Sequence, residues 1–445
     1  MHFVSLYFDH SAELVVNSSG QKVIWSRNQI ENMTVLRMGS VEQPVLQKSG
    51  DDLRIDWGYS CLAIPDQEAH SIAPGSSTAA STTATSRATI STTMSSSSKT
   101  SRPKSSGATT STAMTGHLSA RDAFTETGKL PLSDDLRMPR AAGDDWPVAA
   151  VAFDLGKVGT TPVSRHVLLA YDEQYCIEFL ERRLKPYWRR EGTEIADLLK
   201  TAEKEYETLR HRCEQFDKEL IADLDRVGGE KYARLAVLAY RQCLAAHTMA
   251  VDIDGTPLLF PKENFSNGCV STVDVLYPSS PFFLLFNTRL MNAALTPVLT
   301  YASTERWRHE YAPHDLGTYP LANGQVYGGG EKSDEDQMPV EECGNMLLMV
   351  SAMAVADGSA GYALKYWPLL EKWAAYLLGK GLDPENQLCT DDFAGHLAHN
   401  TNLSVRSSRQ SGSGWLMTAT IIALPLTSRI PGARSTTWFG TGSSA

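Results

Sequence analysis

The hydrophobic period of the chain changes near residue 177, and this change constrains the fold more than any other feature. Over 1–65 apolar residues alternate with polar or smaller ones, as they do in half-buried strands, and strand signals resume at Trp146–Phe153 and at His166–Tyr171. The alternation is clearest over Leu53–Tyr59. From about Ile177 the period becomes helical. The sequence therefore predicts an α+β multidomain chain, in which an antiparallel sheet domain precedes a helical domain.

The helical half contains segments of two kinds. Glu194–Arg226 is amphipathic and rich in charge, and it ends at Gly228-Gly229. Glu230–Met249 is apolar nearly all round, which predicts a helix that is buried on most sides. Asp254-Gly255 predicts a two-residue hairpin turn. Further helices are expected at 281–301, 340–356, 361–379 and 391–400, and such a series fits a layered helical array or a helical toroid.

Two stretches interrupt this organisation. Residues 74–115 are mostly Ser and Thr and contain no aromatic residue, which indicates a disordered, O-glycosylated linker or an altered reading frame. The tail after about Val405 has no sustained period. We therefore expect a partial N-terminal β domain at 1–65, a low-complexity segment at 66–115, the rest of the β domain at 116–175, a helical domain at 176–404 and an irregular tail at 405–445.

Composition excludes some classes of protein. With 41 basic and 51 acidic residues the net charge is −10, and a nucleic-acid binder would instead show a basic face. No apolar run approaches the roughly 18 residues of a membrane-spanning helix. The seven cysteines are dispersed without a C-x-x-C pair, which argues against a zinc knuckle. The N-terminus does not resemble a signal peptide, although four N-x-S/T sequons favour secretion.

Two acidic segments are candidates for catalysis. Glu341 and Glu342 follow Pro339, a pattern typical both of an ordinary helix start and of a carboxylate at the mouth of a helical barrel. Asp391 and Asp392 follow Thr390, which can cap the helix expected there. A metal site can be drawn through Asp392, His396 and His399, but it lacks a fourth ligand, so paired carboxylates for hydrolysis are the better functional interpretation and no metal is predicted.

Two polar segments are candidates for lining a site. One is His314–Pro320, with Asp315 and Tyr319, and the other runs from Lys262 to Asp274 and includes Asn267. Polar, aromatic and Gly-rich loops of this kind often carry binding residues, and they are equally typical of solvated surface. No G-x-S-x-G or S-x-x-K signature of a serine amidase is present where one would be needed.

Several of these strings occur together in one family. Lys262–Phe286, His314–Pro320, Met338–Asn345 and Thr390–Ser404 closely resemble the fungal glutaminase A family, as do Asp144–Val148 and Phe153–Gly156. The resemblance covers about 116–405 and, more loosely, 1–65. It implies a secreted protein with a β-sandwich-like domain, a central helical domain of the six-hairpin, (α/α)6-toroid type, and L-glutamine amidohydrolase activity. Members of the family begin well upstream of this chain, with further β-strands, and continue with more helices after the position of Ser404, where this chain has no pattern. We therefore expect truncation at both ends and an incomplete toroid.

Three functions are consistent with the sequence. The resemblance implies an amidase acting on glutamine, with Thr390, Ser266 or Thr272 as nucleophile, or with water activated by Asp391, Asp392 or Glu341. A glycoside hydrolase could use the same acids and stack sugars on Trp146, Tyr319 or Trp307. The third reading is a non-catalytic member of the family. We choose the amidase, with a small-molecule substrate and no cofactor.

The expected site is the same for either enzymatic function. The expected catalytic residues are Glu341, Glu342, Asp391, Asp392 and Asp315. The expected substrate-binding residues are His314, Tyr319, Trp146, Asn267, Asp274, Thr390 and Asn400.

Overall fold

The computed structural model describes residues 2–66, 109–264, 266–390, 395–405 and 407. The described chain divides into two compact units. The first comprises residues 1–45, 54–174 and 192–213, and the second comprises 46–53, 175–191 and the chain from Glu214 onward. The mixed α+β class that the change of period predicts is confirmed, with antiparallel sheets in the first unit and a largely helical second unit.

The first unit contains two antiparallel sheets. Strand β7 (Pro147–Val158) pairs on one side with β1 (His2–Ser11) and on the other with β5 (Thr109–Gly116). The second sheet has the order β6-β2-β3-β4-β8. Its strands are Arg140–Ala141, Lys22–Ile30, Met33–Ser40, Tyr59–Pro65 and Leu168–Asp172. The Ser/Thr-rich stretch thus ends in a strand, and its residues 67–108 lie outside the described part of the chain.

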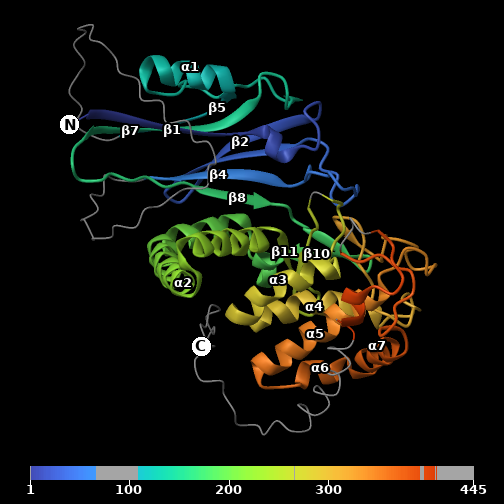
Figure 1. Cartoon of the computed structure of the whole chain (residues 1–445). Coiled ribbons are helices and arrows are strands. Elements are labelled where there is room, and N and C mark those ends of the chain that lie inside the picture. The colour runs from blue at the N-terminus through green and yellow to red at the C-terminus, as the bar shows by residue number, and fades with distance from the viewer. Residues whose placement is uncertain (1, 67–108, 265, 391–394, 406, 408–445) are drawn as a thin grey trace, which may run out of the picture. The chain divides into compact units, whose positions relative to one another are not determined.

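The two sheets of the first unit share one hydrophobic core. Trp25, Leu36 and Leu62 of the five-stranded sheet pack with Met114 and Val151 of the three-stranded sheet. Alternation therefore directs one face of each sheet toward the other, which is the arrangement of a β-sandwich. Helix α1 (His117–Thr127) covers the outer face of the three-stranded sheet through Ala120 (Figure 1).

The second unit combines a small sheet with a set of helices. The sheet has the order β12-β11-β10-β9-β13, and its strands are Pro257–Pro261, His247–Val251, Arg182–Pro186, Ile177–Phe179 and Leu321–Ala322. The helices are α3 (Val273–Phe286), α4 (Thr288–Ala302), α5 (Pro339–Asp357), α6 (Gly361–Lys365) and α7 (Trp367–Lys380).

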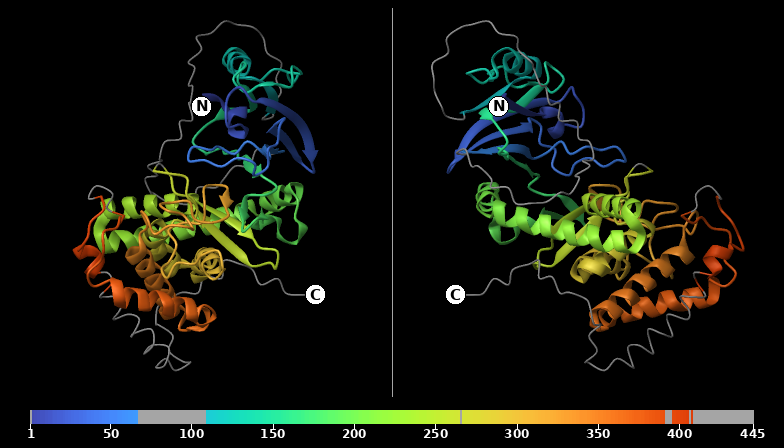
Figure 2. Two further views of the ribbon diagram at one scale, coloured as in Figure 1. Left: turned by 90° about the vertical axis from the view of Figure 1, so that its right-hand side faces the viewer. Right: turned by 60° about the vertical axis from the view of Figure 1, so that its left-hand side comes forward.

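The helices and the sheet of the second unit share a core. Phe260 of β12, Phe283 of α3, Leu295 of α4, Met346 of α5 and Trp373 of α7 are buried together. Helices α5 and α7, both orange, lie side by side (Figure 2). This packing fixes the N-terminal ends of α3 and α5, where the candidate acids lie.

Several predicted elements need correction. The strand predicted over Leu53–Tyr59 is a loop, and β4 begins only at Tyr59, because Gly58 has a φ of +80° and interrupts extended backbone. The helix predicted over 281–301 is two helices that meet at Asn287, whose side chain caps the second one. The helix predicted over 391–400 is wrong in its described part, because Leu397 instead pairs with Gln387 in a β-bridge and His399 has a φ of +57°.

The prediction for Glu230–Met249 is also wrong. Helix α2 spans Ile195–Ala245, interrupted at Gly229, where φ is +76° and ψ is 173°. Past this glycine Ala233 is buried, but the side chain of Leu235 is 67% exposed and Leu238 and Leu244 are also exposed. Apolar composition alone predicts burial only where neighbouring elements surround the helix, and the described residues cover one side, where Tyr240 packs against Phe282 and Phe286.

Candidate functional site

The first component of the candidate site is the N-terminus of α5. Pro339 supplies a preset φ at the start of the helix, and the remote Gln387 Oε1 accepts a hydrogen bond of 3.1 Å from Val340 N–H. Glu341 and Glu342 therefore lie in the first helical turn, where the helix dipole stabilises negative charge. Both are buried, at 1% and 0% exposure, although glutamates at a helix start usually face solvent.

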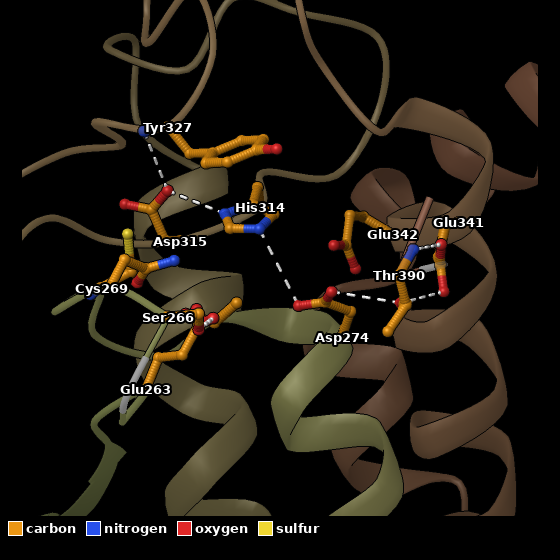
Figure 3. A network of polar contacts seen from close by, with 12 residues as sticks. Glu263, Ser266, Cys269, Asp274, His314, Asp315, Tyr327, Glu341, Glu342 and Thr390 are labelled. Carbon is orange, nitrogen blue, oxygen red and sulfur yellow. Dashed lines mark hydrogen bonds and ion pairs between the residues drawn. The ribbon is translucent and has the colours of Figure 1, made fainter. Parts of the chain in front are cut away.

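The N-terminus of α3 brings a third acid to the same place. The backbone N–H of Val273 donates to His314 O at 2.8 Å, which attaches the start of α3 to the His314 loop. Asp274 follows in the first turn. Its Oδ1 lies 3.9 Å from His314 Nε2, and its Oδ2 lies 3.1 Å from Thr390 Oγ1. Asp274 thus links a buried imidazole on one side with an exposed hydroxyl on the other (Figure 3).

Thr390 contacts one acid from each of these two helices, Asp274 of α3 and Glu341 of α5. Its hydroxyl donates to Glu341 Oε1 at 2.6 Å, and its backbone N–H donates to Glu341 Oε2 at 2.8 Å. The side chain of Thr390 is exposed, whereas the carboxylate that it contacts is buried. A hydroxyl on an exposed residue in contact with a fixed carboxylate is an arrangement that can activate a nucleophile (Figure 3).

Asp315 holds the imidazole in place. Its Oδ2 lies 3.0 Å from His314 Nδ1. Its two oxygens also accept the backbone N–H groups of Gly317, Val326 and Tyr327 at 2.8 to 3.2 Å. The ring of Tyr327 stacks on the imidazole with 4.1 Å between ring centroids. With its oxygens committed in this way, Asp315 is suited to positioning His314 rather than to contacting a substrate.

The buried charges influence one another. Burial raises the pKa of Asp274, and the charges of Glu341 and Glu263 raise it further against the opposing effect of His314. Burial lowers the pKa of His314, but the hydrogen bond with Asp315 and the charges of Asp315 and Asp274 outweigh this effect, so its pKa is raised. The cluster is therefore rich in negative charge, and it favours a positive charge at the imidazole.

Comparison with known proteins agrees with this description. Residues 229–409 match the glutaminase A six helical-hairpin domain, and residues 1–223 match a domain of unknown function, DUF5127. The chain is 35% identical over 294 residues to glutaminase A of Aspergillus oryzae, a match that covers 64% of this chain and 41% of that protein. The chain belongs to the glutaminase A family.

A second relative supports the same family. The chain is 28% identical over 355 residues to a protein of Arthroderma benhamiae that is named as a probable glutaminase, covering 64% of this chain and 40% of that protein. The chain therefore spans about two fifths of the length of these glutaminase A relatives. All the site residues described above lie within the six-hairpin match.

Half of the twelve site residues expected from the sequence come together. Asp274, His314, Asp315, Glu341, Glu342 and Thr390 form one cluster. Asn267 and Tyr319 lie on neighbouring segments: Asn267 Oδ1 accepts from Cys269 N–H at 2.8 Å, and Tyr319 N–H donates to Gly268 O at 2.9 Å. Ser266 and Thr272, the alternative nucleophiles, both donate to Glu263.

The remaining expected residues do not join the cluster. Asp391 and Asp392 lie outside the described residues. Asn400 Oδ1 accepts from Asn402 N–H at 3.0 Å, which is a local turn contact. Trp146 belongs to the first unit, where it is 50% exposed and packs edge-on against His117. Of the histidines in the metal site drawn from the sequence, His396 pairs with Asp336 and His399 pairs with Asp383, so the two contact different acids.

Sequence reasoning missed three contributors to the site. Glu263 accepts hydrogen bonds from the hydroxyl groups of Ser266 and Thr272. The ring of Tyr327 stacks on His314. Asn345 Nδ2 donates to Glu342 Oε2 at 3.3 Å. Asn345 stands one helical turn after Glu342, so the spacing i, i+3 was the available signal for it. Tyr327 follows a loop without periodicity, and no local pattern indicates its partner.

Proposed function

We propose that the protein hydrolyses the side-chain amide of L-glutamine to L-glutamate and ammonia at the site around Thr390 and Glu341. The observation that carries the proposal is the hydroxyl of Thr390, an exposed residue, which donates to the buried Glu341 carboxylate at 2.6 Å. The names of the relatives supply the substrate class, a small molecule with a carboxamide. The alternative nucleophile Ser266 donates to Glu263, which is only half-buried, so the buried Glu341 makes Thr390 the better candidate.

The proposed reaction has two halves. Glu341 accepts the hydroxyl proton while Thr390 Oγ1 attacks the amide carbon, and the same proton then passes to the leaving nitrogen, which departs as ammonia. A γ-glutamyl ester on Thr390 remains. Water attacks this ester while Glu341 takes a proton from the water and returns it to Thr390 Oγ1. The net change is the addition of one water and the release of one ammonia.

Two substitutions of Thr390 test the proposal. Thr390→Val keeps the shape of the side chain but removes the hydroxyl, so ammonia release from glutamine should fall by about 10³-fold or more. Thr390→Ser keeps the hydroxyl and should retain measurable turnover. Glu305→Gln, at an exposed position of the same unit, is the control and should leave the rate unchanged. Full activity in Thr390→Val would exclude this nucleophile.

A glycoside hydrolase is the second candidate. Asp274 Oδ2 and Glu341 Oε1 lie within 3.1 Å and 2.6 Å of one hydroxyl oxygen, so two carboxylates lie close together, as they do in retaining glycosidases. The same purified protein can be given a panel of glycosides. Sugar release without ammonia release would favour this candidate, and no release of either by a folded protein would favour a non-catalytic member of the family.

Secretion is a further part of the proposal. It rests on the resemblance to the family and on the sequons at Asn32, Asn264 and Asn402, whose side chains are exposed, whereas Asn17 is half-buried and accepts from Arg54 N–H. No helix among the described residues is long and apolar enough to cross a bilayer.

A further inference from the structure

We propose that Asp274, His314 and Glu342 bind a divalent metal ion, with Zn²⁺ as the best match to the donor set. One ligand atom of each residue lies within 4.8 Å of the ligand atoms of the other two. All three residues belong to the second unit, and they come from the first turn of α3, the loop before β13 and the first turn of α5. Binding of the ion is independent of the proposed function, whereas any use of the ion in amide hydrolysis rests on it.

The orientation of His314 is the first argument for the site. The residue is 4% exposed, and Asp315 faces its Nδ1 at 3.0 Å. This contact fixes the ring and directs Nε2 toward Asp274 Oδ1, at a distance of 3.9 Å that is too long for a hydrogen bond. A carboxylate on one ring nitrogen with the other nitrogen facing further ligands is the usual arrangement of a metal-binding histidine.

The carboxylates supply the second argument. Asp274 Oδ1 is buried and has no hydrogen-bond partner among the described residues, while its other oxygen faces Thr390. Asn345 supports Glu342 from the next turn of α5 through a bond of 3.3 Å to Oε2. A buried carboxylate oxygen without a hydrogen bond is costly unless a cation approaches it.

The dimensions fit a small ion. Ligand atoms at about 2.1 Å from a tetrahedral Zn²⁺ lie about 3.4 Å from one another, so the present spacings close onto an ion with side-chain shifts of about 1 Å. An imidazole with two carboxylates suits Zn²⁺ better than Mg²⁺ or Ca²⁺, which prefer oxygen ligands throughout. Three protein ligands leave a fourth position open for water or a substrate oxygen, as in catalytic zinc sites. Because Asp274 also contacts Thr390, an ion here would lie beside the proposed nucleophile.

Metal analysis of the full chain tests the site directly. Protein stripped with a chelator is dialysed against Zn²⁺, and bound metal is counted in the Cys213→Ser background, because Cys213 is an exposed thiol. We expect one Zn²⁺ per chain, a rise in the melting temperature on binding, and at least a 100-fold loss of affinity in His314→Gln and in Asp274→Asn. His309→Gln is the matched control, since His309 pairs with Asp334 elsewhere in the unit, and it should bind as the parent does.

The absorption spectrum of the parent protein loaded with Co²⁺ is a second readout, and it does not require that any variant folds. We expect a visible spectrum typical of nitrogen and oxygen ligands, without the near-ultraviolet band of a thiolate ligand. No stoichiometric binding by the parent, unchanged binding in folded His314→Gln and Asp274→Asn, or a thiolate band would each overturn the proposal. Binding of Ca²⁺ in preference to Zn²⁺ would also overturn it. Because all these readouts are independent of turnover, a protein that binds Zn²⁺ but releases no ammonia would refute the proposed function and leave the metal site standing.

Discussion

At the scale of single residues, burial determines what the polar groups of this protein can do. Glu341 is almost fully buried, yet its two oxygens meet the hydroxyl and the backbone N–H of one exposed residue, Thr390. Two hydrogen bonds therefore determine the position of the carboxylate relative to the hydroxyl. The same reasoning distinguishes Asp315, whose contacts are all internal, from Asp274, which keeps one oxygen without a hydrogen bond among the described residues.

His10 gives a prediction at this scale. It is buried in β1 with Ser60 Oγ 3.4 Å from its Nε2, and burial lowers its pKa from 6.5 to about 4, against a smaller opposing effect of Asp9. Between pH 6.5 and pH 4 the unfolded chain therefore binds a proton at His10 more readily than the folded unit does. The free energy of unfolding of the first unit falls as the pH is lowered through this range. The loss between pH 7 and pH 5 should be about 2 kcal/mol.

Hydrogen exchange of the amides in the β1–β7 ladder, measured at both pH values, checks this expectation. His10→Gln, which cannot be protonated, should flatten the pH dependence of β-sandwich opening. His2→Gln, at an exposed position of the same strand, should leave it as in the parent. If the opening free energy of His10→Gln depended on pH as strongly as that of the parent, His10 would not be the group responsible.

At the scale of elements, the starts of α3 and α5 carry the site without a side-chain N-cap, whereas the helix between them, α4, has one. Asn287 ends α3 and caps α4, accepting from Arg289 N–H at 3.1 Å. We expect Asn287→Ala to reduce the free energy of unfolding by about 1 kcal/mol, because a first-turn N–H loses its acceptor. Asn287→Asp retains an acceptor and should stay close to the parent in urea unfolding. Equal losses in both variants would show that the cap contributes nothing.

The elements also show how far the sequence leads. The change from a strand period to a helical period correctly predicts the two architectures, because hydrophobic period follows directly from backbone geometry. The exposure of Leu235 and the break at Asn287 were missed, since the first depends on which elements surround a helix and the second on a single side-chain contact. Local patterns do not contain this information.

The candidate site shows the same division. Glu341 and Glu342 were found because acids at a helix start are visible in the sequence, and Asp274 was found as part of a polar segment whose helix start was not predicted. Their meeting at Thr390 was not visible, because Thr390 is 116 positions from Asp274 and contacts it only through the tertiary fold. The expectation that Thr390 caps a following helix concerns residues 391–394, which lie outside the described part of the chain, whereas the bonds described for its hydroxyl and N–H run to Glu341 and Asp274.

At the scale of the whole molecule, all the residues of the candidate cluster lie in the second unit. The six-hairpin match includes every member of the cluster, and both helix N-termini and the His314 loop come from this unit. The match to DUF5127 covers 1–223, which includes the β-sandwich and none of the cluster residues. The proposed amide hydrolysis would therefore take place in the helical unit.

The most direct test compares Glu341→Gln with the parent in steady-state release of ammonia from glutamine. The glutamine side chain introduced at position 341 has the same shape as the glutamate that it replaces, but it cannot take up the Thr390 proton. The account therefore predicts that kcat falls by about 10²- to 10⁴-fold while the protein stays folded. The control Glu305→Gln should match the parent. Parental kcat in a folded Glu341→Gln variant would contradict the claim that this carboxylate drives the reaction.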